Sequence, residues 1–355
     1  MKAKKILAGI LAGLMTFGAY FVDTEAATRA EIAAVKVRKN GNFKYWNKNA
    51  EPITALKNYV KDVTNRSSKN FIPVEDRIAV FDMDGTIFCE TAPYYFDYML
   101  FLHRTLDDKS YTPSAADRDF AVNIDRYIRT RDESYKKGSG STHKASVFAG
   151  LTDSEFAAYV EDFMGTRVEG LTNLTYGESF YLPMVEVIKY LQANEFTVYI
   201  VSGCDRNIIR VLASDLLKVP VSNVIGSDVK ILAKNQGDTD PLKYRYAADD
   251  YLIRGEFVTK DTQMNKVSGI AREIGKQPVL AFGNSSDDLS MLNYTVNGNK
   301  YKSLGFFVIC DDIERELGDT AKAEKCVRLA QDNGWMCISM RDDFKTIYGD
   351  NVRRN

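Results

Sequence analysis

Two carboxylates separated by one residue follow a short apolar run in this chain. Residues 78–81 read Ile-Ala-Val-Phe, and residues 82–86 read Asp-Met-Asp-Gly-Thr. Such a run between polar residues predicts a buried parallel strand, and Gly85 permits a turn after it. Asp82 and Asp84 should then lie at the carboxyl end of the strand, where open α/β sheets bind ligands. This arrangement suits a nucleophile with its own acid/base group.

Polar side chains also follow two later apolar runs. The predicted strand 196–201 ends in Ser202 and Gly203, and the predicted strand 278–282 ends in residues 283–288, Gly-Asn-Ser-Ser-Asp-Asp. Lys266 begins the helix before the second of these strands. Carboxylates, a hydroxyl and a cation at one sheet edge are what phosphoryl transfer through an aspartyl-phosphate requires.

Each of these residue types has a place in that chemistry. Carboxylate oxygens suit a hard Mg²⁺, while Thr86, Ser202 and Lys266 can hold phosphoryl oxygens. Lys260 is the rival of Lys266 for the cationic role. It lies in a polar stretch, where solvation is the simpler interpretation, so we favour Lys266.

The elements that position these residues alternate between strands and helices. Helices are expected at 53–64, 184–193, 207–217 and 266–274, and further strands at 221–226, 306–310 and 335–340. This alternation predicts an α/β fold, a Rossmann-like parallel sheet with right-handed crossovers. The polar interruption 232–262 is expected to hold a β-hairpin about Gly255.

Residues 89–175 show helices and loops without a clear strand. Thr152 and Glu155 form a capping-box pattern before an amphipathic helix, and residues 137–142 read as a flexible linker. One crossover needs far fewer residues, so we expect a helical cap domain inserted after the first strand. The predicted organisation is 1–27 signal peptide, 28–88 leader and start of the core, 89–175 cap, and 176–355 remainder of the core. Residues 28–50 are expected to be a surface leader.

Composition indicates a globular protein. The chain has 355 residues, 45% of them hydrophobic, and its 47 basic and 48 acidic residues leave a net charge of -1. This balance gives no support for nucleic-acid binding, so a small-molecule partner is expected. The two histidines, His103 and His143, have no metal-ligand spacing.

The N-terminus resembles an export signal. Lys2, Lys4 and Lys5 precede an apolar stretch from Ile6 to Val22, which small residues follow. We expect a secreted or extracytoplasmic protein, with membrane attachment only if this segment stays uncleaved. Five cysteines leave one thiol unpaired, and one pair among Cys310, Cys326 and Cys337 could be bridged.

Taken in order, the motifs at 82–86, 202–203, 266 and 283–288 resemble those of the haloacid dehalogenase superfamily, in its cap-bearing phosphatase branch. The likeness extends to bacterial exported acid-phosphatase-like members over most of residues 45–348. It implies that Asp82 is the nucleophile and Asp84 the general acid/base. It also implies that Ser202, Gly203 and Lys266 bind phosphate with help from Gly85 and Thr86, and that Mg²⁺ is the cofactor.

The fourth motif departs from the family pattern. In phosphoserine phosphatases it begins with Gly-Asp, and that Asp binds the metal, whereas Asn284 stands here. An amide oxygen binds Mg²⁺ less strongly than a carboxylate, so Asp288, or Asp287 beside it, should carry more of the charge. With Asp82 and Asp84, the implied metal ligands are Asn284 and Asp288.

The predicted function is an exported Mg²⁺-dependent phosphomonoesterase. A dehalogenase needs no acid for a leaving group, so Asp84 favours phosphate; a catalytically idle cell-surface binding protein is the other alternative, which Asn284 keeps open. Glu90 stands near the position where phosphoserine phosphatases hold the substrate's amino group. Together with Tyr94, Tyr95 and Phe96 it suggests a preference for a cationic head, although Glu90 as a helix-capping residue is an equal alternative.

Overall fold

The computed structural model describes residues 26–136 and 138–355. At its centre is a seven-stranded sheet in the order β4-β3-β2-β1-β5-β6-β7. The strands are β1 Ile78–Phe81, β2 Thr197–Asp205, β3 Val224–Ala233, β4 Leu252–Thr259, β5 Leu280–Gly283, β6 Leu304–Ile309 and β7 Met336–Ser339. All neighbouring strands are parallel except β4, which runs antiparallel to β3. The predicted α/β fold with a mostly parallel sheet is confirmed.

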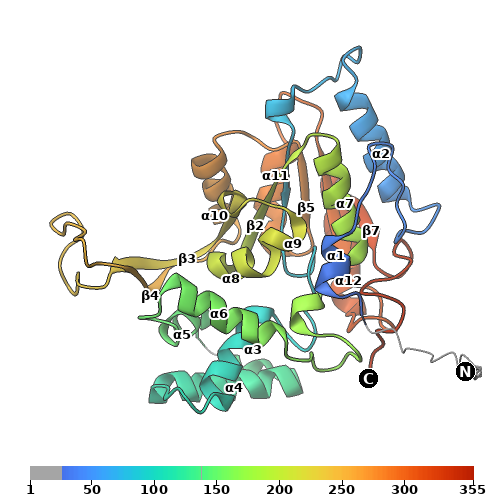
Figure 1. Cartoon of the computed structure of the whole chain (residues 1–355). Coiled ribbons are helices and arrows are strands. Elements are labelled where there is room, and N and C mark those ends of the chain that lie inside the picture. The colour runs from blue at the N-terminus through green and yellow to red at the C-terminus, as the bar shows by residue number, and fades with distance from the viewer. Residues whose placement is uncertain (1–25, 137) are drawn as a thin grey trace, which may run out of the picture.

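Helices cover both faces of this sheet (Figure 1). The α-helices of the described residues are α1 Arg29–Ala33, α2 Glu51–Thr64, α3 Phe96–Leu102, α4 Ala115–Thr130, α5 Gly140–Ser146, α6 Asp153–Met164, α7 Leu182–Ala193, α8 Arg206–Ile209, α9 Asp215–Leu217, α10 Met264–Gly269, α11 Leu289–Val296 and α12 Thr320–Asn333. Helices α2 and α7 pack on one face, and α11 and α12 pack on the other.

Strand β1 lies in the middle of the sheet and is buried on both faces. Ala79 pairs with Val198 of β2 on one side and with Leu280 of β5 on the other. Ala79 and Phe81 belong to one hydrophobic core, whereas Ile78 and Val80 belong to the other. A strand that is apolar at every position is what a central parallel strand requires, and the predicted bounds are confirmed.

Residues 89–175, the helical segment, gather at one end of the sheet as α3 to α6 (Figure 1). The capping box is confirmed, because Thr152 accepts from the backbone of Glu155, whose side chain in turn caps Thr152 at the start of α6. The flexible linker is wrong for residues 140–142, which belong to α5, whereas residues 138 and 139 are irregular and exposed. Helix α5 begins at Gly140, where a Cβ would lie 2.3 Å from the Tyr98 hydroxyl, so close packing explains the glycine. Lys137 lies outside the described residues.

The expected surface leader is also wrong. Ile32, Val37 and Trp46 are buried in the core, and the Trp46 indole donates to the Pro183 carbonyl at 2.9 Å. Arg29 donates to two carbonyls far away in the sequence. A few irregularly spaced anchors hold this segment, and such spacing leaves no periodic signal in a polar sequence.

A hairpin about Gly255 was expected, but the structure has one continuous strand there. Strands β3 and β4 form the hairpin, and together they project from the sheet as an arm (Figure 1). The register shifts between Val229 and Ile231, so Gly255 faces a bulge, where its Cβ would lie 3.1 Å from Lys230. This glycine allows the close approach of β3 and β4 and does not form a turn.

The predicted signal peptide lies outside the described residues except for Ala26 and Ala27, whose backbones bond to Asn173 and Tyr348. Within the described part of the chain, no helix is both long and apolar enough to cross a membrane. All five cysteines are free thiols, so the bridge considered for the C-terminal cluster is absent here.

Candidate active site

The turn after β1 directs both predicted acids toward one cavity. The Asp82 amide donates to the Phe282 carbonyl of β5, which continues the sheet by one residue. Gly85 then adopts a φ of +77°, and a Cβ there would lie 1.9 Å from the Asn284 side-chain nitrogen. Glycine is therefore required both by the backbone conformation and by the space available.

Asp82 and Asp288 share the ammonium of Lys266. The Lys266 Nζ donates to an oxygen of each carboxylate at 2.6 Å and to the Val201 carbonyl at 2.8 Å. Burial and the charge of Asp288 raise the pKa of Asp82 to about 7, against the pull of Lys266. Burial alone would lower the pKa of Lys266, but the two carboxylates raise it, so Lys266 stays a cation.

Within the described residues, Asp84, unlike Asp82, has no lysine ammonium bonded to its carboxyl group. Its Oδ1 is buried and has no hydrogen-bond partner. Burial, followed by the charges of Asp97 and Asp82, raises the pKa of Asp84 well above its ordinary value. A raised pKa favours the protonated form of the carboxyl group, which is the form that a general acid needs.

The fourth motif buries Asp288 and leaves Asp287 exposed, although both line the same cavity. The Asp288 Oδ2 accepts from the backbone amides of Asn284 and Ser285 at 3.0 and 3.1 Å. Asp287 is exposed, and its Oδ1 accepts from Gln263. The Thr86 hydroxyl donates to the Asn284 Oδ1 at 3.4 Å. These contacts form a second layer behind the two acids of β1.

A β-bulge presents the second motif. Val201 pairs with Ile225 and Asp205 with Ser227, so β2 has more residues than β3 in this interval. Bulges next to active sites re-aim side chains, and Ser202, Gly203 and Cys204 line the cavity here. The Ser202 hydroxyl is buried and accepts from the Cys204 amide.

These groups surround a central cavity of about 230 Å³. The sheet edge contributes Asp82, Asp84, Ser202, Gly203, Lys266, Asp287 and Asp288, and the helical segment contributes Tyr94, Tyr95, Asp97, Tyr98 and Lys136. The structure thus brings together the predicted nucleophile, acid and phosphate-binding side chains. Gly85 and Thr86 lie beside Asn284 instead of on the cavity wall.

Glu90 lines the same cavity but already has a partner. Its carboxylate is buried and forms an ion pair with Lys322 of α12. A cationic head could reach this carboxylate only in competition with Lys322. The role of Glu90 in substrate binding stays a prediction.

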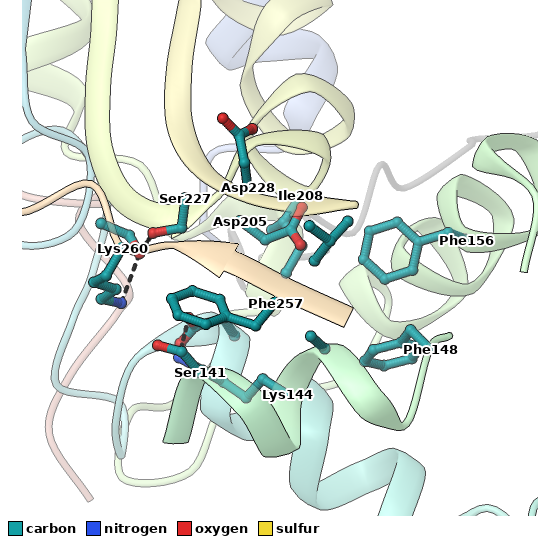
Figure 2. A pocket seen from close by; sticks show the side chains of 14 residues that line it. Ser141, Lys144, Phe148, Phe156, Asp205, Ile208, Ser227, Asp228, Phe257 and Lys260 are labelled. Carbon is teal, nitrogen blue, oxygen red and sulfur yellow. Dashed lines mark hydrogen bonds and ion pairs between the residues drawn. The ribbon is translucent and has the colours of Figure 1, made fainter. Parts of the chain in front are cut away.

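Lys260, which was expected to be solvated, lines the cavity, and so does Asp97, which the sequence did not single out. Lys260 follows β4, and its ammonium donates to the Gly203 carbonyl at 2.6 Å. Figure 2 shows Lys260 beside Ser227, in a smaller side pocket that adjoins the cavity between α5 and β4. Only the pairing of β4 with β3 brings Lys260 here, and a polar stretch carries no sign of that pairing.

The acids are not gathered as a ready metal site. Within residues 26–136 and 138–355, no group of three His, Cys, Asp and Glu side chains is arranged to hold a metal ion. Among the described residues, however, the Asn284 Nδ2 at this site is buried without a hydrogen-bond partner. The ends of an amide are interchangeable by rotation, so Asn284 can present an oxygen instead. An amide oxygen together with the carboxylates of Asp82 and Asp288 fits a hard divalent cation.

Comparisons with known proteins agree with this architecture. The sequence matches the haloacid dehalogenase-like hydrolases over residues 79–293, more than half of the chain, and the chain therefore belongs to that family. The resemblance inferred from the four motifs is confirmed. Comparison with curated proteins gives no match.

Solved structures resemble this one at low sequence identity. A conserved protein of unknown function from Anaerococcus prevotii has a TM-score of 0.50 and 12% identity, covering 88% of this chain and 97% of its own, and shows a shared fold. The structure of cytosolic 5'-nucleotidase IIIB bound to cytidine has a TM-score of 0.46 and 12% sequence identity, and the match covers 82% of this chain and 87% of that one. A phosphoserine phosphohydrolase-like protein from Francisella tularensis has a TM-score of 0.37 and 15% sequence identity, and the match covers 74% of this chain and 94% of that one.

Proposed function

We propose that this chain is a Mg²⁺-dependent phosphomonoesterase that acts through an aspartyl-phosphate on Asp82. The observation that carries this proposal is the contact of Lys266 with both Asp82 and Asp288, beside Asp84, whose pKa is raised by burial and by neighbouring carboxylates. A positioned carboxylate, a cation and a proton donor in one cavity are the groups that phosphate ester cleavage needs.

In the first step a carboxylate oxygen of Asp82 attacks phosphorus, and the bond from phosphorus to the ester oxygen breaks. Asp84 gives its proton to the departing oxygen, so the product leaves as a neutral alcohol. In the second step Asp84 takes a proton from water as that water attacks phosphorus. The products are inorganic phosphate and free Asp82, while Lys266 and Ser202 hold the phosphoryl oxygens.

Mg²⁺ would be held by Asp82, Asp84, Asn284 and Asp288, and when bound it neutralises charge on the phosphoryl group. We also propose that the helical segment is the cap. The position of α3 to α6 at one end of the sheet and the three tyrosines that line the cavity support this role. Export remains part of the proposal on the strength of the N-terminal sequence.

The test is release of phosphate from p-nitrophenyl phosphate by the full chain. We expect turnover with Mg²⁺, its loss with EDTA, and its return when Mg²⁺ is added back. Asp82→Asn serves as the matched inactive control. If the wild type releases no phosphate from any of a panel of phosphomonoesters, the alternative of a catalytically idle binding protein replaces this proposal.

A further inference from the structure

The acidic residues on the far wall of the central cavity are already neutralised. Glu90 is paired with Lys322, and Asp97 is paired with Lys144 of α5. Both carboxylates are buried. A substrate that enters beyond the phosphoryl site therefore does not meet free negative charge from these two groups.

Lys260 differs from these lysines because it forms no close ion pair in the described part of the chain, although its charge acts through space on the carboxyl groups of Asp97 and Asp84. Among the described residues, no carboxylate lies within ion-pair distance of its ammonium, and its hydrogen bond goes to the neutral Gly203 carbonyl. An ammonium has three donors, so two remain available. The side chain is half-buried and lines both the cavity and the side pocket.

The arm holds Lys260 in this place. Arg254 of β4 lies 3.7 Å from the centre of the Phe156 ring of α6 and donates to Asp205 at 2.5 Å. The backbone of Arg254 also bonds to Gly150 and Leu151. Figure 2 shows Phe257 of the same strand facing Lys144 and Ser141 on α5. Lys260 thus follows a strand that is fixed to both the sheet and the helical segment.

We propose that Lys260 binds a second anionic group on the alcohol part of the substrate. The preferred esters then carry a carboxylate or a further phosphate besides the phosphate that is cleaved. This inference rests on the proposed phosphomonoesterase function and gives it a substrate class. An anionic group on the substrate is the opposite of the cationic head that the sequence suggested on the basis of Glu90.

The test compares kcat/KM for three aryl phosphates that differ only at position 4 of the ring: phenyl phosphate, 4-carboxyphenyl phosphate and 4-(trimethylammonio)phenyl phosphate. We expect the wild type to prefer the carboxyphenyl ester over the ammonium ester by roughly 10- to 100-fold, the range for a hydrogen bond to a charged group. The ammonium substituent makes the better leaving group, so this order cannot arise from leaving-group chemistry.

Variants assign the preference to Lys260. Lys260→Met should remove it, Lys260→Arg should restore most of it, and Lys234→Met, at an exposed lysine of the same arm, should leave the ratio unchanged. Melting temperatures of all variants report whether each one folds. Turnover with no carboxylate preference, or with one that survives in Lys260→Met, overturns the inference alone. A wild type inert toward all three esters and the wider panel overturns the proposed function and this inference with it.

Discussion

Asp82 beyond β1 and Asp288 beyond β5 each place a carboxylate oxygen 2.6 Å from the same Lys266 ammonium. All three side chains are buried, so two negative charges share one positive charge in a region of low dielectric. The cluster keeps a net negative charge, and this charge repels an anionic phosphoryl group unless a further cation lies beside it. Under the proposed function, this relationship is the reason to expect dependence on Mg²⁺ and to expect that Lys266 is hard to replace.

Lys266→Met should abolish phosphatase activity and lower the free energy of unfolding by about 3–5 kcal/mol, because it leaves two buried carboxylates without their partner. Urea unfolding followed by circular dichroism measures the second effect. Adding Asp288→Asn to this variant should recover part of the stability but none of the activity. Wild-type stability in Lys266→Met would show that the three groups are not paired.

Asp82→Asn should eliminate turnover without loss of fold, since the amide is nearly isosteric but cannot form an acyl-phosphate. A phosphate-release assay and a melting curve decide between chemical and structural effects. Activity near that of the wild type would contradict the mechanism.

Asp84→Asn should slow turnover by about 10²–10⁴-fold with an alkyl phosphate and least with p-nitrophenyl phosphate, whose leaving group needs little protonation. The measurement is kcat for both esters in both proteins. Equal losses for the two esters would argue against proton donation by Asp84.

Asn284→Asp should tighten Mg²⁺ binding, because it adds a negative oxygen where the Asn284 Nδ2 is now unpartnered. Without metal the same change should destabilise the fold, since the new charge lies near Asp288. Melting temperature against Mg²⁺ concentration reports binding independently of activity. An unchanged Mg²⁺ midpoint would remove position 284 from the metal ligands.

Gly85→Ala should reduce both stability and activity. Its Cβ would collide with Asn284 and with Glu90, at 1.9 and 2.6 Å, in addition to the strain of a φ of +77°. Gly275→Ala is the matched control, because Gly275 has a φ of +69° and no neighbouring atom within 4 Å of its Cβ position. The control should lose about 1 kcal/mol and keep its activity, and Gly85→Ala should lose about 1–3 kcal/mol more. Similar losses in both variants would mean that only the backbone conformation matters.

Stability should fall in acid partly through Asp76. Hydrogen bonds from Lys276 and Tyr301, and the nearby Lys300, lower the pKa of Asp76 to about 2. A lowered pKa stabilises the fold above the unfolded value of 3.8, and this contribution disappears as the pH falls from about 4 toward 2. Asp76→Asn should therefore cost about 1 kcal/mol at pH 7 and little at pH 2, as urea unfolding at both pH values can show. Asp238→Asn, at an exposed loop position, should be neutral at both.

Much of the core could be predicted from local sequence. Strand β1 was predicted with its observed bounds, because a strand buried on both faces must be apolar at every position. The helix that begins after Thr152 was predicted because its capping residues are close in sequence. The failures have a common cause: the buried leader, the packed Gly140 and the β3–β4 hairpin all depend on contacts with distant segments.

The same division applies to the site. The sequence alone determined which acids follow which strands and that Lys266 precedes β5, since strand order and residue type are local properties. Only the tertiary structure decided that Asp288 rather than Asp287 contacts Lys266, that Lys322 pairs with Glu90, and that Lys260 reaches the cavity. Those facts depend on burial and on long-range pairing, in which a side chain's charge is neutralised, or left free, by residues that the chain brings near only after it has folded.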